Sequence, residues 1–211
     1  MFNLLNFFIL VVVIVCALTV HEFAHAWVAH KLGDDTAKRA GRVSLNPIRH
    51  LDLVGSLVFL ITQMIGWGKP VPVNLNNFKN PLRANALVAF AGPLSNFLFA
   101  LVIAIFLKFF PAGLPVLVAG FLGALMNINI ILGAFNLLPF PPLDGSKIIG
   151  IFVPRRFEGL YLKYLDDGFV YFLLFLMFDL FVLANILGGG VISFLVSKIV
   201  FVVRSLVLFG V

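Results

Sequence analysis

Long apolar runs dominate this sequence and limit the folds that it can adopt. The first run, from Phe7 to Val20, contains no charged residue. An α-helix needs about 20 apolar residues to cross the hydrocarbon core of a bilayer. Five segments have roughly this length and character, namely residues 4–32, 83–108, 115–138, 168–187 and 191–209. The sequence therefore predicts an all-α, polytopic membrane protein with about five to six transmembrane helices.

The overall composition supports a single membrane domain. Hydrophobic residues make up 62% of the 211 residues and charged residues 11%, which excludes a soluble globular protein. We predict one domain over residues 1–211, with a core over about 4–150 and a helical hairpin over about 168–209. The net charge of +6 does not require a nucleic-acid partner, because basic residues in cytoplasmic loops explain it.

Two histidines and a glutamate stand at the end of the first apolar run, in the motif His21-Glu22-Phe23-Ala24-His25. Residues four apart lie on one face of an α-helix, so both imidazoles can bind one metal ion. Glu22 can then take a proton from water that the metal activates. Ionisable groups are costly inside a membrane and usually mark a functional site. The alternative is a pair of helix-end histidines that are hydrogen-bonded to their neighbours.

A hydrolytic zinc site needs a third protein ligand, and Asp144 is the candidate. It closes an apolar helix and is followed by Gly145, so its carboxylate can reach inward. The alternative role is an ordinary helix-end cap at the membrane interface. Two imidazoles and one carboxylate are a common ligand set for catalytic zinc, and we expect one Zn²⁺ per chain.

Three motifs in this order resemble the site-2 protease family of intramembrane zinc metalloproteases. They are His21–His25, Ala91-Gly92-Pro93-Leu94-Ser95-Asn96, and the segment 136–145 with its Leu-Asp-Gly ending. Segments 41–50 and 67–74 are also similar to bacterial members, so the resemblance covers about residues 12–150. In the absence of a PDZ-like or CBS-like region, the chain is similar to a minimal bacterial or archaeal member.

This resemblance implies roles for five residues. His21, His25 and Asp144 would bind zinc, and Glu22 would be the general base. Asn136 would contact the substrate peptide or the oxyanion.

The number of crossings follows if Asp144 is a ligand, because Asp144 must then return to the membrane side of the histidines. Three full crossings before residue 144 achieve this, whereas a fourth at 51–67 would not. We therefore predict that 51–67 is re-entrant or only partly inserted and that 68–74 is extended. Twelve of the 15 Lys and Arg residues (positions 31 through 83 and 147 through 163) then lie on the cytoplasmic side, and the site opens toward it.

Three further polar residues lie within apolar helices. Asn96 is expected either to hydrogen-bond between helices or to support a ligand histidine from behind. Asp179 and Lys198 lie ten residues before and nine residues after Gly189. In a helical hairpin both would lie about 14 Å from the turn. We predict that they form a buried ion pair, with a gate or a proton path as the alternative role.

The sequence thus predicts a zinc endopeptidase in a bacterial or archaeal cell membrane, with its active site toward the cytoplasm. Its partners would be the lipid bilayer and transmembrane protein substrates, without nucleic acid, and a homo-oligomer stays open. One alternative is a catalytically silent membrane-embedded binding protein, against which the intact Glu22 argues. A more distant alternative is a metal transporter, which would need ligands along a path.

Overall fold

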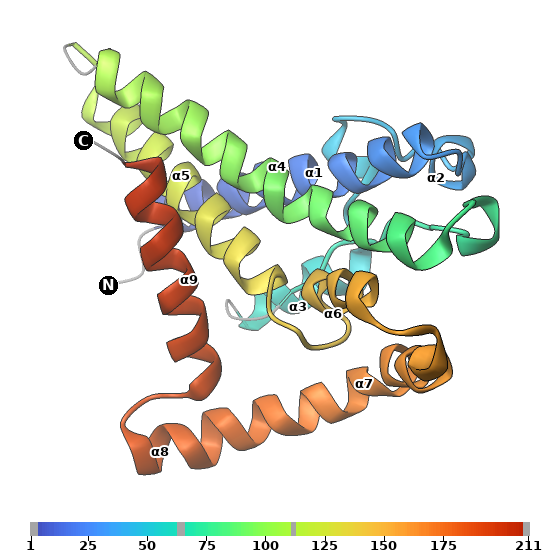
Figure 1. Cartoon of the computed structure of the whole chain (residues 1–211). Coiled ribbons are helices and arrows are strands. Elements are labelled where there is room, and N and C mark those ends of the chain that lie inside the picture. Colours follow the sequence, from blue (N-terminus) through green and yellow to red (C-terminus); the bar gives the residue numbers. More distant parts are fainter. Residues whose placement is uncertain (1–3, 63–65, 111–112, 209–211) are drawn as a thin grey trace.

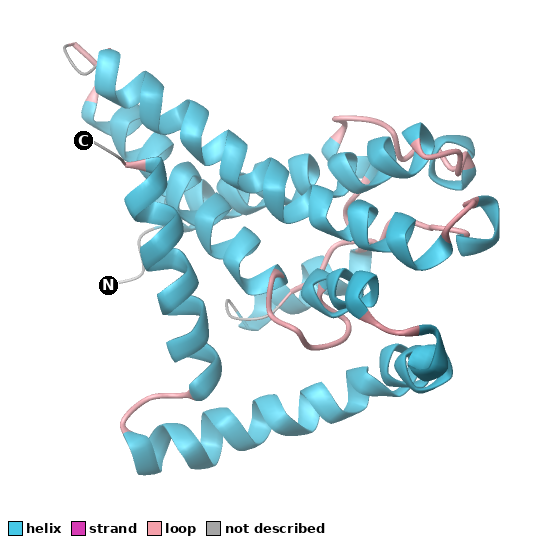
Figure 2. Cartoon of the chain, in the orientation of Figure 1, coloured by secondary structure: helices cyan, strands magenta, loops and turns pink. Residues whose placement is uncertain are grey.

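The computed structural model describes residues 4–62, 66–110 and 113–208. Within these ranges the chain forms helices and loops, with one isolated antiparallel bridge between Leu51 and Gly68 (Figure 2). The all-α prediction is confirmed. The long helices are α1 (Leu4–Lys31), α4 (Pro81–Phe109), α5 (Val116–Asn136), α7 (Glu158–Phe178) and α9 (Val191–Val207). The shorter ones are α2 (Thr36–Arg39), η1 (Pro47–Arg49), α3 (Leu53–Thr62), η2 (Leu75–Asn77), α6 (Asp144–Ile148), η3 (Ile149–Phe152), η4 (Arg155–Phe157), η5 (Asp179–Leu183) and α8 (Ala184–Leu187).

Helices α1, α4 and α5 form the centre of the molecule (Figure 1). Small residues allow α1 to approach its neighbours closely, since Ala17, Ala26 and Ala29 are completely buried. The main apolar core lies between these helices and α9, and its buried members are Val13, Ala100, Ile103, Ala104, Leu125, Met126, Ile130 and Val207. The site described below is built on this three-helix centre.

Four helical segments of the described chain are long and apolar enough to cross a membrane. They are Leu4–Lys31, Pro81–Phe109, Val116–Asn136 and Arg155–Ile186. Helix α9 is a further long helix of 17 residues, slightly shorter than a typical span. The first three agree with the predicted spans to within a few residues, whereas the fourth starts earlier than predicted.

Helix α3 occupies most of the segment predicted to be re-entrant. It has 10 residues, so it extends about 15 Å, roughly half of a hydrocarbon core. Residues 63–65 of this segment lie outside the described residues. After them, the chain returns to the start of α3, where the Lys69 N–H donates to the His50 carbonyl at 2.8 Å. The described part of 51–67 therefore contains no helix long enough to span a membrane.

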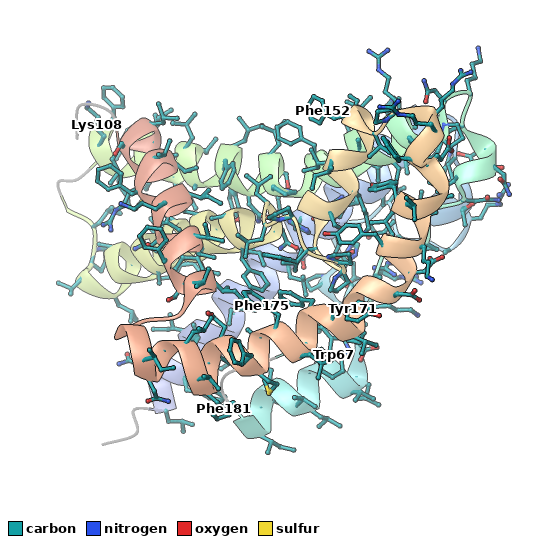
Figure 3. All side chains as sticks on the ribbon, turned by 60° about the horizontal axis from the view of Figure 1, so that its bottom comes forward. Trp67, Lys108, Phe152, Tyr171, Phe175 and Phe181 are labelled. Atoms are coloured by element: carbon teal, nitrogen blue, oxygen red, sulfur yellow. The ribbon has the colours of Figure 1, made fainter. Side chains whose placement is uncertain are left out.

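The C-terminal helices do not form the predicted hairpin. Helices α7 and α8 are joined through the π-helical turn η5 into one long helix, with aromatic side chains such as Tyr171, Phe175 and Phe181 along it (Figure 3). Helix α9 then leaves at a steep angle and packs across α4 and α5 (Figures 1 and 3). The angle between α7 and α9 is filled by the segment after α5, through Leu138 and Leu143.

The predicted ion pair between Asp179 and Lys198 is consequently wrong. The buried Asp179 carboxylate accepts hydrogen bonds from the backbone N–H groups of Val191 (2.6 Å) and Ile192 (3.1 Å). Lys198 is exposed, with its Nζ 5.3 Å from the ring centroid of Phe194. Because α9 turns away from α7, equal distance from the turn does not bring the two side chains together. The free amides and the dipole at the start of α9 hold Asp179 instead.

Candidate metal centre

The three predicted metal ligands converge at one point. Helix α1 supplies His21 and His25, and the first residue of α6 supplies Asp144. The two Nε2 atoms lie 3.0 Å apart, and Asp144 Oδ2 lies 3.1 Å from that of His21 and 3.2 Å from that of His25. All three residues are buried. Within the part of the chain that the structure describes, they form a group able to hold a metal ion.

Hydrogen bonds behind the imidazoles determine which ring nitrogens carry protons. His25 Nδ1 lies 2.7 Å from the Val88 carbonyl, which can only accept, so Nδ1 donates. His21 Nδ1 lies 2.7 Å from Asn96 Oδ1. The orientation of Asn96 is set by its Nδ2, which donates to the Ala17 carbonyl and to Asn129 Oδ1. Both histidines therefore carry hydrogen on Nδ1, and their Nε2 atoms, which face Asp144, are the ones placed to bind a metal ion.

The donor set fits a zinc ion. The two imidazole Nε2 atoms and the buried Asp144 Oδ2 lie within 3.2 Å of one another. A metal ion bound between these three atoms would neutralise the carboxylate and accept both imidazole lone pairs. Tetrahedral zinc with bonds of about 2.0–2.1 Å separates its ligand atoms by about 3.3 Å, close to the distances found here.

Helix α4 lies directly against the imidazoles, at Gly92. A Cβ atom built on Gly92 would come within 2.5 Å of His25 Nε2 and 2.6 Å of His21 Cε1. Any side chain at this position would therefore overlap the metal-binding face of the rings. The absence of a side chain at Gly92 lets α1 and α4 pack closely without displacing the histidines.

Glu22 faces an arginine that sequence reasoning did not single out. Glu22 Oε2 is buried without a hydrogen-bond partner, and Arg42 Nη2 lies 3.8 Å from it. Burial lowers the pKa of the Arg42 guanidinium, and the charge of Glu22 opposes this shift. The sequence placed Arg42 only among the basic residues expected on the cytoplasmic side. Its place in segment 41–50, which resembles the bacterial members, was the available signal.

One cavity contains the site, and a second cavity adjoins it. One, of about 540 Å³, is lined by His21, Glu22, His25, Asp144 and Asn136 among others. Asn136 Nδ2 donates within its own helix, to the Leu132 carbonyl at 3.0 Å. The other cavity, of about 530 Å³, is mainly apolar and lies between α1, α3 and α5. The cavities share the lining residues Leu18, Gly66, Trp67, Gly68, Leu132 and Phe135.

The structure thus brings most of the predicted site residues together. The three candidate ligands, Glu22 and Asn136 line one cavity, and Asn96 lies behind His21. Asp179 and Lys198 are not among the residues that line either cavity.

Comparison with known proteins identifies relatives along most of the chain. The model of peptidase family M50 matches residues 114–178, which include Asn136 and Asp144. "Putative zinc metalloprotease YwhC" of Bacillus subtilis is 40% identical over 190 residues, 86% of each chain. "Putative zinc metalloprotease MJ0611" of Methanocaldococcus jannaschii is 31% identical, over 70% of this chain and 72% of its own.

"Putative zinc metalloprotease Rip2" of Mycolicibacterium smegmatis is 35% identical over 61% of this chain and 51% of its own. No solved structure matches the chain significantly. The four apolar helices support a membrane protein, and the similarity to YwhC covers 86% of both chains. This protein therefore belongs to peptidase family M50, the site-2 protease family that its motifs predicted.

Proposed function

We propose that this protein is an intramembrane zinc endopeptidase that hydrolyses peptide bonds in or near transmembrane segments of other membrane proteins. The observation that carries this proposal is the convergence of His21, His25 and Asp144 in a cavity that also contains Glu22. The names of the relatives, which describe zinc metalloproteases, support the same reaction class.

Each site residue has a role that follows from its contacts. When bound, zinc would supply a Lewis acid that activates a water molecule. Glu22 would accept a proton from that water and pass it to the leaving amine, because its Oε2 has no competing hydrogen bond. Asn96 and the Val88 carbonyl hold the two imidazoles in the metal-binding tautomer. Asn136 has amide capacity left for the substrate backbone or the oxyanion.

The second cavity supports a membrane-embedded substrate. Its apolar lining can accept side chains of a transmembrane segment, while the scissile bond lies in the adjoining cavity beside Glu22. Helical peptide bonds are enclosed by the helix, so the segment must unwind locally before it is cut. We therefore expect substrates with helix-weakening residues near the cleavage position.

The distribution of charge supports a proposal for the location. Most basic residues lie in the loops after α1, before α4 and after α5, which are the loops that would face the cytoplasm. The protein would thus be a multi-pass protein of a bacterial or archaeal cell membrane, with its site near the cytoplasmic face.

The experiment that tests this function is cleavage of a model transmembrane substrate by purified protein in detergent, together with zinc counting. We expect about one zinc per chain, and Glu22→Gln should lower kcat by about 10²–10⁴-fold while zinc is retained. Glu158 is the only other glutamate in the sequence, so Glu158→Gln is the matched control and should cleave normally.

Two results would contradict the proposal. A Glu22→Gln protein that cleaves as fast as the parent would exclude Glu22 as the general base. A parent protein that binds zinc but cleaves no member of a broad substrate panel would favour the silent binding protein.

A further inference from the structure

Arg42 is a buried cation for which the mechanism above has no role. It lies in the loop between α2 and η1 and is only 3% exposed. Its Nη1 donates to the Pro70 carbonyl at 3.0 Å, and its Nη2 donates to the Lys69 carbonyl. These bonds connect two loops that are far apart in the sequence and fix the plane of the guanidinium group.

His50 completes this arrangement. It is fully buried, and its Nε2 lies 2.7 Å from the Ser44 carbonyl, which can only accept. His50 Nδ1 is therefore an acceptor, and it lies 3.4 Å from Arg42 Nη2. The two protons of Nη2 are thus directed to Lys69 and His50.

The same nitrogen faces the carboxylate of Glu22. The distance of 3.8 Å between Arg42 Nη2 and Glu22 Oε2 is too long for a hydrogen bond. The two charges still attract each other strongly in a largely dehydrated setting. A direct hydrogen bond would occupy the lone pair that Glu22 needs to accept a proton. The carbonyls of Lys69 and Pro70 hold the cation back from this contact.

We propose that Arg42 is a positioning residue for Glu22. Its charge, fixed by two backbone carbonyls, directs the Glu22 carboxylate into the metal-centre cavity and leaves the carboxylate oxygen free. This inference rests on the proposed function, because it takes Glu22 as the general base. The loop that Arg42 binds is also part of the cavity wall, because Gly68 and Pro70 line the same cavity as Glu22.

The catalytic test compares Arg42→Met with Arg42→Lys. Loss of the charge lets the carboxylate turn away, and misplacement by about 1 Å can cost about 10²-fold in rate. Arg42→Met should therefore lower kcat about 100-fold and change KM less than about 3-fold, with zinc content unchanged. Lysine keeps the charge but not the planar guanidinium group, so kcat of Arg42→Lys should be about 10-fold higher than that of Arg42→Met.

Arg39→Met is the control, because Arg39 is an exposed arginine three residues away, at the end of α2. It should leave kcat and KM as in the parent. The inference is overturned if Arg42→Met changes KM alone, or if Arg42→Lys is as slow as Arg42→Met.

A second test requires neither zinc nor cleavage, so it distinguishes failure of this inference from failure of the proposed function. In metal-free protein, Arg42→Met should lower Tm because it leaves the Glu22 carboxylate buried without a countercharge. In a Glu22→Gln background the same change should lower Tm by less than half as much. Equal decreases in the two backgrounds would mean that Arg42 only anchors the loop and does not act on Glu22.

Discussion

Asn96 reaches His21 from α4 and determines which nitrogen of the imidazole carries the proton. Removing such a partner usually weakens metal binding about 10–100-fold. We expect this loss of zinc affinity in Asn96→Ala, measured by competition with a chelator. Asn127→Ala is the matched control, because Asn127 bonds only within α5, to the Gly123 carbonyl. Equal affinity in the two variants would contradict a supporting role for Asn96.

Asp34 connects the end of α1 to the loop before α4. Its fully buried carboxylate accepts hydrogen bonds from Thr36 N (3.0 Å), Asn74 N (2.8 Å) and Asn77 Nδ2 (2.6 Å). Burial raises the pKa of Asp34, but these hydrogen bonds outweigh burial and hold the pKa below its ordinary value. The ionised form is therefore the one that stabilises the fold.

This shift predicts how stability depends on pH. A depressed pKa in the folded state contributes stability above the unfolded pKa, about 3.9, and the contribution is lost as pH falls through the folded value. Asp34→Asn should lower Tm at pH 7, and its difference from the parent should shrink as pH falls below about 4. Asp166→Asn, at an exposed position, should differ little from the parent at either pH. A constant difference for Asp34→Asn would contradict the role of the charge.

At the scale of helices, α4 packs against α1 directly at the metal centre, through Gly92. An added methyl group would overlap both imidazole rings, so Gly92→Ala should displace them. We expect loss of zinc from this variant and a destabilisation of about 1–3 kcal/mol, measured by zinc counting and denaturation. Gly120→Ala is the control, because a Cβ on Gly120 of α5 meets no atom within 4 Å. Full zinc content in Gly92→Ala would contradict this packing.

The junction of α8 with α9 depends on Asp179. Its carboxylate caps the first turn of α9, and such caps contribute about 0.5–2 kcal/mol. Asp179→Ala should lower the free energy of unfolding by about this amount and speed amide exchange at Val191 and Ile192. Lys198→Ala should change stability by less than about 0.5 kcal/mol, because Lys198 is exposed. A larger effect of Lys198→Ala would contradict this account and support the ion pair with Asp179.

At the scale of the whole molecule, the sequence predicted what depends on local information. Apolar length predicted α1, α4 and α5, and helical spacing placed His21 and His25 on one face. The third ligand, Asp144, was a candidate because it closes an apolar helix, and the resemblance to a family implied the same residue. The direction of α9 was not predictable, because it depends on how Leu138 and Leu143 fill the angle beside α7. Arg42 was missed because its role depends on contacts with residues 69 and 70, far along the chain.

Membrane orientation is a prediction about the whole chain. Figure 3 shows Lys108 near one end of the molecule and Phe152 toward the other. In a Cys16→Ser background, the thiol of Lys38→Cys should react with an impermeant maleimide only from the cytoplasmic side. The thiol of Lys108→Cys should react only from outside. Labelling of both positions from the same side would contradict the proposed topology.

The position of the ligands along the chain has a consequence for biosynthesis. His21 and His25 leave the ribosome early, whereas Asp144 follows only after α4 and α5 have been made. During this interval the nascent chain contains two of the three metal ligands, and the metal site is incomplete. The proposed endopeptidase would then be unable to cut the helices of the translocation machinery while it is inserted beside them. Late synthesis of a single carboxylate would delay activity without a propeptide or an inhibitor.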